Sequence, residues 1–185
     1  MTRVIPFENH AIERLRARCV AVEEANQDLI AFARGHSGAV SSIHQAVLAG
    51  MEAPSLDALL HIVAQEWPLI LGLDAVALAL VVGKRGFRVD SGGVQLVDPA
   101  LLGRSLDQVG SVTLRAVERG HPLFGPACDL IRAEALVRLH GEGPAGLLVL
   151  GQRTEQSLDG RHGGELLLFL GRSLSAMIAG WMRTL

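Results

Sequence analysis

The residues of this sequence that could do chemistry are its histidines, its cysteines, and a group of arginines and acids in the second half. Seven histidines are spread from His10 to His162, and no two of them have the tight His-x-x-x-His spacing of a zinc site on a helix. Two cysteines, Cys19 and Cys128, are too few for a disulfide framework or a four-cysteine zinc site. We therefore expect no metal and no other cofactor.

Motifs for nucleophilic catalysis and phosphate binding are weak in this sequence. No Gly-x-Ser-x-Gly elbow occurs, and the glycine-rich stretch 141–146 falls between two predicted strands. A phosphate cradle needs a strand before it and a helix after it, so a hairpin turn is the better interpretation. Cys128 is either a thiolate near arginines or, as is commoner, a small buried apolar residue. The sequence predicts a protein that is not an enzyme.

The best candidate for specific binding is the polar face of a strand at 131–139. Apolar residues alternate there with Arg132, Glu134, Leu136 and Arg138, and period two indicates a strand. Arginines in a partly dry pocket would suit a carboxylate or phosphate, because the guanidinium fork matches those oxygens. The alternative is a solvated sheet face with Arg–Glu pairs. The candidate ligand-binding residues, from this strand and the segments expected near it, are Arg88, Arg115, His121, Phe124, Arg132, Glu134 and Arg138.

The elements that must position these residues are terminal helices around an antiparallel sheet. Helices are predicted at 8–34, 39–51, 56–71 and about 162–183, with a break or a kink at Gly35–Gly38. Strands are predicted at 74–82, 87–90, 112–117, 131–139 and 145–151, with 94–97 extended, a single helical turn at 99–102 and a polar loop at 153–160. The fold class is therefore α+β, with a sheet of about five strands packed on N- and C-terminal helices and led by a long helix.

The first helix carries a stripe whose spacing alternates between three and four residues. Such a stripe is the heptad seam of a coiled coil, and a lone core asparagine such as Asn26 can fix the register of a parallel pair. We expect a homodimer through this helix, parallel or antiparallel. The alternative is an amphipathic helix lying on its own domain, since about four turns of seam is short. The predicted dimer-interface residues are Ile12, Leu15, Cys19, Val22, Asn26 and Leu29.

Bulk composition excludes several classes of protein. Of 185 residues, 49% are apolar, which suits a packed core, and the net charge of −2 gives no field to attract nucleic acid or an anionic membrane. The most apolar stretches, 69–82 and 166–182, contain Asp74 and Arg172. Neither is the uninterrupted run of about 20 apolar residues typical of a membrane span, and no signal peptide is evident. We expect a cytoplasmic protein without nucleic-acid or membrane partners.

The order of elements resembles a GAF domain, and the residue pattern resembles the GAF-like family called domain of unknown function 484 (DUF484). The resemblance covers roughly residues 20–184 and rests on hydrophobic patterns and turn glycines. The residues that carry it are Ala25-Asn26, Ile43-His44, Ala46-Val47-Leu48, Ser55-Leu56-Asp57, Leu71-Gly72-Leu73-Asp74, Leu123-Phe124-Gly125, Gly146-Leu147-Leu148-Val149-Leu150-Gly151 and Gly163-Gly164. The resemblance implies a ligand-sensing or protein-interacting regulatory domain, and it brings no catalytic activity with it.

The sequence thus predicts a leading dimerisation segment, 1–52, and a GAF-like domain, 53–185. The expected function is regulatory: the domain binds a small molecule or a protein partner and acts through a helical dimer interface. One alternative is a structural adaptor whose interior is filled by side chains and takes no ligand, and a weaker one is a small enzyme using the arginine–glutamate face. A pocket lined by Arg132, Glu134 or Arg138 would favour sensing, and a sealed apolar interior would favour the adaptor.

Overall fold

The computed structural model describes residues 7–154 and 161–183. Within its helices, the side chains of residues 7–15, 17, 25, 28–34, 36, 161 and 162 lie outside the described part. The chain divides into two compact units, Met1–Val40 and Ser41–Leu185, and each is described by itself. The domain boundary that we predicted between residues 52 and 53 stays a prediction.

The first element, α1 (Phe7–Met51), is one uninterrupted helix, so the break predicted at Gly35–Gly38 is wrong. A glycine in a helix interior costs roughly 1 kcal/mol relative to alanine, which weakens a helix without ending it. No proline follows these glycines to stop the helix. The flanking predictions of helix at 8–34 and 39–51 are confirmed.

The predicted coiled-coil seam lies in the first unit. Cys19, Val22 and Asn26 are exposed there, with Val22 at 66% exposure. The side chains of Ile12, Leu15 and Leu29 lie outside the described residues. Dimerisation through this seam therefore stays a prediction.

A second helical segment runs through α2 (Leu56–His61), the π-helical η1 (Ile62–Glu66) and α3 (Trp67–Leu71). It begins where Ser55 Oγ accepts a hydrogen bond from the Ala58 N–H at 3.1 Å, as the predicted N-cap requires. It ends at Gly72, whose φ of 65° is the left-handed conformation that favours glycine. The prediction of helix over 56–71 is confirmed.

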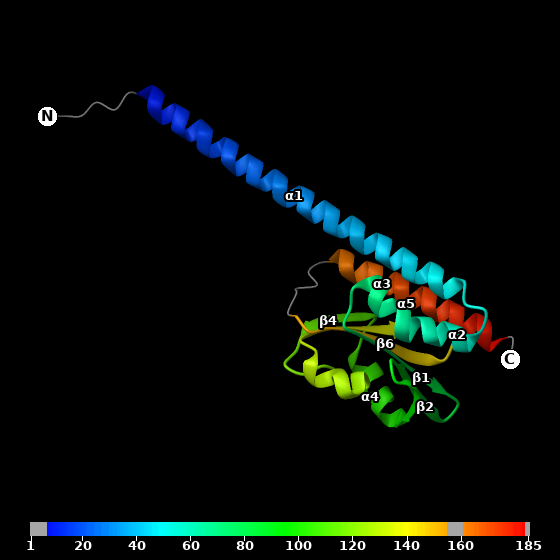
Figure 1. Ribbon diagram of the computed structural model, residues 1–185. Coiled ribbons are helices and arrows are strands. Elements are labelled where there is room, and N and C mark those ends of the chain that lie inside the picture. The colour runs from blue at the N-terminus through cyan, green and yellow to red at the C-terminus, as the bar shows by residue number, and fades with distance from the viewer. Residues whose placement is uncertain (1–6, 155–160, 184–185) are drawn as a thin grey trace. The chain divides into compact units, whose positions relative to one another are not determined.

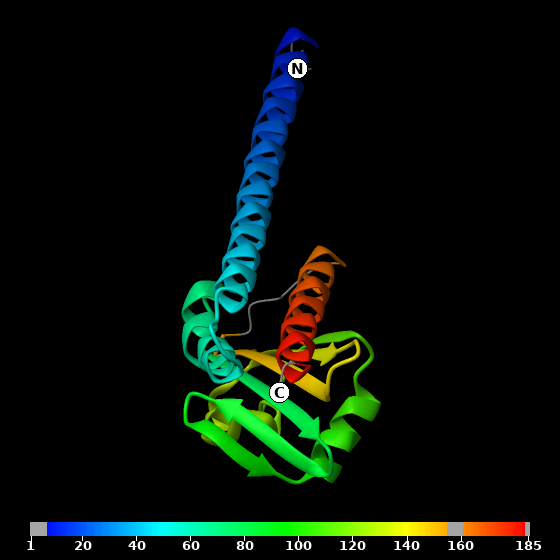
Figure 2. The ribbon, with the colours of Figure 1, turned by 90° about the vertical axis from the view of Figure 1, so that its right-hand side faces the viewer.

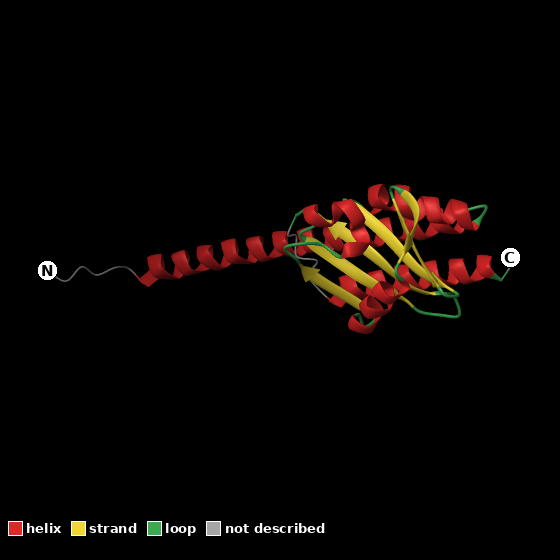
Figure 3. Cartoon of the chain, turned by 90° about the horizontal axis from the view of Figure 1, so that it is seen from below, coloured by secondary structure: helices red, strands yellow, loops and turns green. Residues whose placement is uncertain are grey.

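The sheet is antiparallel and has six strands, in the order β3-β2-β1-β6-β5-β4 (Figures 1 and 3). The prediction of about five was one short, because the segment at 94–97 pairs fully with its neighbour. The strands are β1 (Ala75–Val82), β2 (Arg85–Asp90), β3 (Gly93–Val97), β4 (Val112–Ala116), β5 (Ala133–Leu139) and β6 (Ala145–Gln152).

Between β3 and β5 the chain covers one face of this sheet. Helix α4 (Pro99–Gln108) is longer than the single turn predicted at 99–102, since Leu102 and Leu106 bury successive turns of it against the sheet. Asp98 Oδ1 caps the helix by accepting from the Ala100 N–H at 2.9 Å. The 3₁₀ segment η2 (Pro122–Leu130) follows β4. We call α4 and η2 together the cover.

The opposite face of the sheet carries the helices: the end of α1, the α2–η1–α3 segment and α5 (Arg161–Met182) (Figure 2). The indole N–H of Trp67 donates to the Ala46 carbonyl at 3.0 Å, which ties α3 to α1. Gly50 lets α1 approach α5 closely, because a β-carbon there would lie 2.9 Å from the Met177 sulfur. The polar loop predicted at 153–160 falls largely on residues 155–160, which lie outside the described part.

Among the described residues, one helical stretch, Gly163–Met182, is long and apolar enough to cross a membrane by length and composition. Leu170, Leu174 and Ile178 of this stretch are at most 1% exposed and pack into the core of the sheet's helical face. A helix that contributes to a hydrophobic core has the same composition, so this finding is weak evidence for a membrane span.

Candidate functional site

The residues predicted to bind a ligand lie under or beside the cover. The space between the sheet and the cover is filled by apolar side chains that form one buried cluster. Its members larger than alanine and cysteine are Leu102, Leu106, Val109, Leu123, Phe124, Ile131, Leu136, Leu147 and Val149. A polar group buried within this cluster must therefore find its partners inside the protein.

Glu134, on β5, is the centre of the polar contacts under the cover. Its side chain is 0% exposed, so it is not part of a solvated sheet face. One carboxylate oxygen, Oε1, accepts from Arg115 Nε at 2.7 Å and lies 2.6 Å from Arg115 Nη2. The other, Oε2, accepts from the backbone N–H of His121 at 2.6 Å. Arg115 lies directly opposite Glu134 in the β4–β5 register, so strand pairing places this ion pair.

His121 links Glu134 to α4. Its Nδ1 accepts from the Leu123 N–H at 3.2 Å, and its Nε2 lies 2.9 Å from Ser105 Oγ. Because Nδ1 accepts, the ring proton lies on Nε2 and is donated to Ser105, whose hydroxyl donates to the Leu101 carbonyl at 3.0 Å. Burial lowers the pKa of His121 below its usual 6.5; Glu134 opposes this and Arg115 adds to it. The imidazole is neutral in this arrangement.

Ser105, His121 and Glu134 are the residue types of a catalytic triad, but their geometry is different. In a triad the carboxylate accepts from the imidazole ring, whose other nitrogen removes the serine proton. Here Glu134 contacts the backbone of His121, and the ring donates a proton toward the serine. The chain Glu134–His121–Ser105 therefore fastens the cover to the sheet, and we call it the latch.

Arg138 of β5 and Arg132, which directly precedes this strand, bond to other parts of this face. Arg132 Nη1 donates to the carbonyl oxygens of Glu118, Asp129 and Ile131 at 2.9–3.0 Å. Arg138 Nη1 donates to the Leu106 carbonyl at 3.1 Å. Both guanidinium groups are thus engaged with backbone oxygens.

Arg88 makes its contacts apart from the latch, whereas the Phe124 backbone N–H donates to the His121 carbonyl at 3.0 Å. Arg88 Nε pairs with Asp90 at 3.0 Å, and its Nη2 donates to the Gln95 side chain. Gly125, with φ 58°, lies over the Arg88 guanidinium, where a β-carbon would come within 2.8 Å of Nη1. Phe124 is buried in the apolar cluster. Of the seven predicted residues, the structure therefore joins Arg115, Glu134, His121 and, through its backbone, Phe124, and places the other three separately.

Sequence reasoning missed Ser105, Gln95 and Gly125. Ser105 could have been found if the helix predicted at 99–102 had been extended, because Ser105 then lies one helical turn after Leu101, whose carbonyl its hydroxyl can reach. Nothing in the sequence pairs Gly125 with Arg88, since the contact joins the cover to β2. In the described part of the chain no group of three or more His, Cys, Asp or Glu residues could hold a metal ion.

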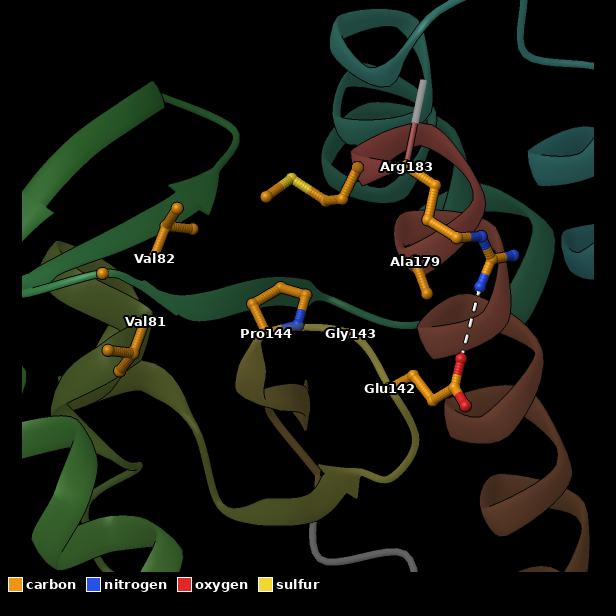
Figure 4. A pocket seen from close by; sticks show the side chains of 9 residues that line it. Val81, Val82, Glu142, Gly143, Pro144, Ala179 and Arg183 are labelled. Atoms are coloured by element: carbon orange, nitrogen blue, oxygen red, sulfur yellow. Dashed lines mark ion pairs between the residues drawn. The ribbon is translucent and has the colours of Figure 1, made fainter. Parts of the chain in front are cut away.

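A pocket of about 390 Å³ lies away from the latch, at the C-terminal end of α5. Arg183 Nη1 and Glu142 Oε2 lie 3.5 Å apart at its rim, and both side chains are mostly exposed (Figure 4). None of the seven predicted ligand-binding residues lines it. Its lining consists of Val81, Val82, Gly83, Glu142, Gly143, Pro144, Ala179, Met182 and Arg183.

Comparison with protein families gives one match. The family described as "Protein of unknown function, DUF484" matches residues 1–183, which confirms the resemblance drawn from the sequence. Among curated proteins none matches this sequence significantly.

Comparison with solved structures confirms the GAF-like α+β fold. The GAF domain of a phosphoenolpyruvate-protein phosphotransferase from Coxiella burnetii has a TM-score of 0.58 at 15% identity, over 80% of this chain and 97% of that one. The GAF domain of a sensor histidine kinase from Bacillus halodurans has 0.54 at 14% identity, over 70% and 97%. The free methionine-R-sulfoxide reductase of Neisseria meningitidis has 0.58 at 17%, over 77% and 89%. Regulatory proteins and an enzyme share this fold, so the likeness extends to the fold alone.

Proposed function

We propose that this chain, which belongs to the DUF484 family, is a non-catalytic regulatory domain that acts by pairing its helices with a second copy of itself. The observation that carries the proposal is a set of apolar residues exposed on two neighbouring helices. The interior under the cover, by contrast, is occupied by the protein's own side chains. A regulatory domain with a filled interior must act through its surface.

On the second unit, exposed side chains of α1 and α5 together make up what we call the helical patch: His44, Leu48, Met51 and Phe169. His44, Leu48 and Met51 follow one face of α1 at helical spacing, with Leu48 56% and Met51 66% exposed. Phe169 of α5 is 46% exposed and meets His44 edge to face, with ring centroids 6.2 Å apart. Apolar area of this kind gains about 25 cal/mol per Å² when a partner covers it.

The first unit supports the same interpretation independently. Val20 and Val22 are 53% and 66% exposed, and Asn26 is exposed beside them on the helix. In a paired coil Val22 would be buried, and the Asn26 side chain would bond to its twin.

The polar contacts under the cover also favour a surface-based function. Glu134 is already bonded to Arg115 and His121, and Arg132 and Arg138 each hold backbone carbonyl oxygens through Nη1, so an anionic ligand would compete with these contacts. Leaving a buried polar group of this face without its partner costs about 1–3 kcal/mol before the ligand gains anything. This arrangement supports a function at the surface over a sensor that uses this face.

Sedimentation equilibrium of the full chain tests the proposal. We expect the full chain to self-associate at micromolar concentration, and the double change Leu48→Lys and Phe169→Lys to lower its average mass by removing the contact through the helical patch, because the new charges cannot be buried at that interface. The control is Leu69→Lys, an 84% exposed leucine on α3 outside the helical patch. A wild-type chain that is monomeric at this concentration would overturn the proposal.

A second candidate is a small-molecule sensor that uses the pocket at the end of α5. The observation in its favour is that Ala179, Met182 and Arg183 of this region line the pocket, so a ligand would contact the helical layer. Native mass spectrometry of freshly purified protein would detect a retained molecule. Val82→Trp should fill the pocket and remove that molecule from the spectrum while leaving the oligomeric state unchanged.

A further inference from the structure

Strand β3 forms one margin of the sheet, and its outer side faces no strand within the described residues (lower margin of the sheet in Figure 2). Four of its five residues are exposed, including Val94 at 59% and Leu96 at 72%. Its outward backbone N–H and C=O groups are therefore open to another strand.

Exposed edge strands usually carry a feature that discourages pairing, such as a charge, a proline or a covering segment. The sequence of β3, Gly-Val-Gln-Leu-Val, has no charge and no proline. The opposite edge strand, β4, differs: it carries Arg115, and its Val112 and Leu114 pack against the core of the helical face. This contrast singles out β3 as the edge that is suited to pairing.

The two faces of β3 differ in character. Val94 lies opposite Val89, a buried member of the core on the helical face, and Leu96 lies opposite Phe87. Gln95 lies opposite Arg88 on the cover face. The apolar face of the sheet thus continues onto β3 and stays exposed there.

We propose that β3 pairs with β3 of a second copy, antiparallel and with Gln95 on the two-fold axis. In that register Val94 lies opposite Leu96 twice, and Gly93 lies opposite Val97 twice. The first pair joins two apolar side chains, and the second joins glycine to a branched side chain. The two glutamine amides can each donate and accept a hydrogen bond. No like charges face each other, so the strand is complementary to itself. This self-complementarity identifies a second copy, rather than an unrelated extended peptide, as the partner.

This inference does not depend on the proposed function, because β3 contains none of the helical-patch residues. A chain with two different self-pairing surfaces can associate beyond a dimer. Pairing through β3 would join the two sheets into one continuous sheet, as strand addition does elsewhere.

Disulfide cross-linking of the full chain tests the register directly. In a background with Cys19→Ser and Cys128→Ala, Gln95→Cys should form a covalent dimer on mild oxidation, because its twin lies directly opposite. Mixing the Val94→Cys chain with the Leu96→Cys chain should give a cross-linked pair, whereas either chain alone should give little. Equal cross-linking in all of these samples, or none, would overturn the proposal.

A second measurement separates this surface from the helices. Val94→Lys with Leu96→Lys should abolish concentration-dependent protection of the β3 amides from hydrogen exchange, because lysines facing each other repel across the pair. Leu130→Lys, at a 50% exposed leucine of η2, is the matched control and should keep that protection. Adding Phe169→Lys to the Gln95→Cys chain should leave its cross-link intact even if the helical dimer is broken. Exchange of β3 that is independent of concentration in the wild type would refute self-pairing.

Discussion

Replacing Glu134 with glutamine tests whether the latch holds the cover to the sheet. The change is nearly isosteric, so it leaves no cavity and alters only charge and hydrogen bonding. A carboxylate accepts from both Arg115 and the His121 backbone, whereas an amide has one accepting oxygen and a nitrogen that can only donate. Glutamine must therefore turn its nitrogen toward one of these two donors.

The magnitude follows from these contacts. A hydrogen bond to a charged group contributes about 1.5–3 kcal/mol, and a buried donor left without an acceptor costs about 1–3 kcal/mol. The Arg115 side chain is 49% exposed, so water can replace its partner and its share lies at the low end. We expect Glu134→Gln to lower the free energy of unfolding by about 2–4 kcal/mol, and Tm by on the order of 10 °C.

Urea unfolding followed by circular dichroism measures this quantity, with wild type and variant compared at the same slope m. The matched control is Glu142→Gln, which removes the charge of a 91% exposed carboxylate paired with Arg183. That pair is screened by solvent, so the control should unfold like the wild type. If Glu134→Gln also unfolds within about 0.5 kcal/mol of the wild type, the latch does not stabilise the fold and the reasoning fails.

Three further predictions concern other parts of the chain. The lowered pKa of His121 means that the folded state resists protonation, so the free energy of unfolding should be highest above pH 6.5 and fall as the pH drops below it. His121→Gln should reduce this dependence of stability on pH, measured as urea midpoints at several pH values. An unchanged pH dependence would exclude His121 as its source. Gly146→Ala should destabilise the fold by about 1–3 kcal/mol, because the new β-carbon would lie 2.8 Å from the Ala79 carbonyl oxygen. Gly38→Ala has no neighbour within 4 Å and should stabilise the helix by about 0.5–1 kcal/mol. Thermal unfolding should therefore show a lower Tm for the first variant and a higher Tm for the second, and equal changes in Tm would contradict the packing argument. Asn26→Leu should strengthen the paired coil and loosen its register; if sedimentation equilibrium and urea unfolding both stay the same, Asn26 does not lie in a seam.

The strands and terminal helices could be predicted because their patterns are local. The alternation at 131–139 correctly separated Glu134 from Ala135 and Val137, which lie on opposite faces of β5, but the strand begins only at Ala133, and Ile131 belongs to the cluster under the cover. The full length of α4 could not be seen, because Gly103 and Arg104 interrupt its apolar pattern although Leu106 is buried. A local pattern gives the spacing of side chains, and tertiary packing decides how far an element extends.

The site was predictable only as a list of residue types. Period two placed Arg132, Glu134 and Arg138 on one side of a strand, but exposure on that side depends on what covers it. The cover comes from between β3 and β5, and its contact with Glu134 runs through the backbone of His121. Almost any residue can supply a backbone N–H, so the residue type at position 121 does not indicate that a carboxylate bonds there. For that reason the sequence could not separate a ligand site from an internal fastening.

The strand order has a consequence for how the chain is made. Strand β1 lies at the middle of the sheet beside β6, the last strand to be synthesised, and Ala75 pairs with Gly151. At roughly 5–20 residues per second, a ribosome finishes β6 several seconds after β1. During that interval the hairpins β1–β2 and β2–β3 can form. The edge of β1 that later pairs with β6 stays unpaired, and β1 is rich in valine and alanine. The sheet therefore cannot close until its last strand is made, and the chain carries an apolar strand with one unpaired edge through most of the synthesis of this domain.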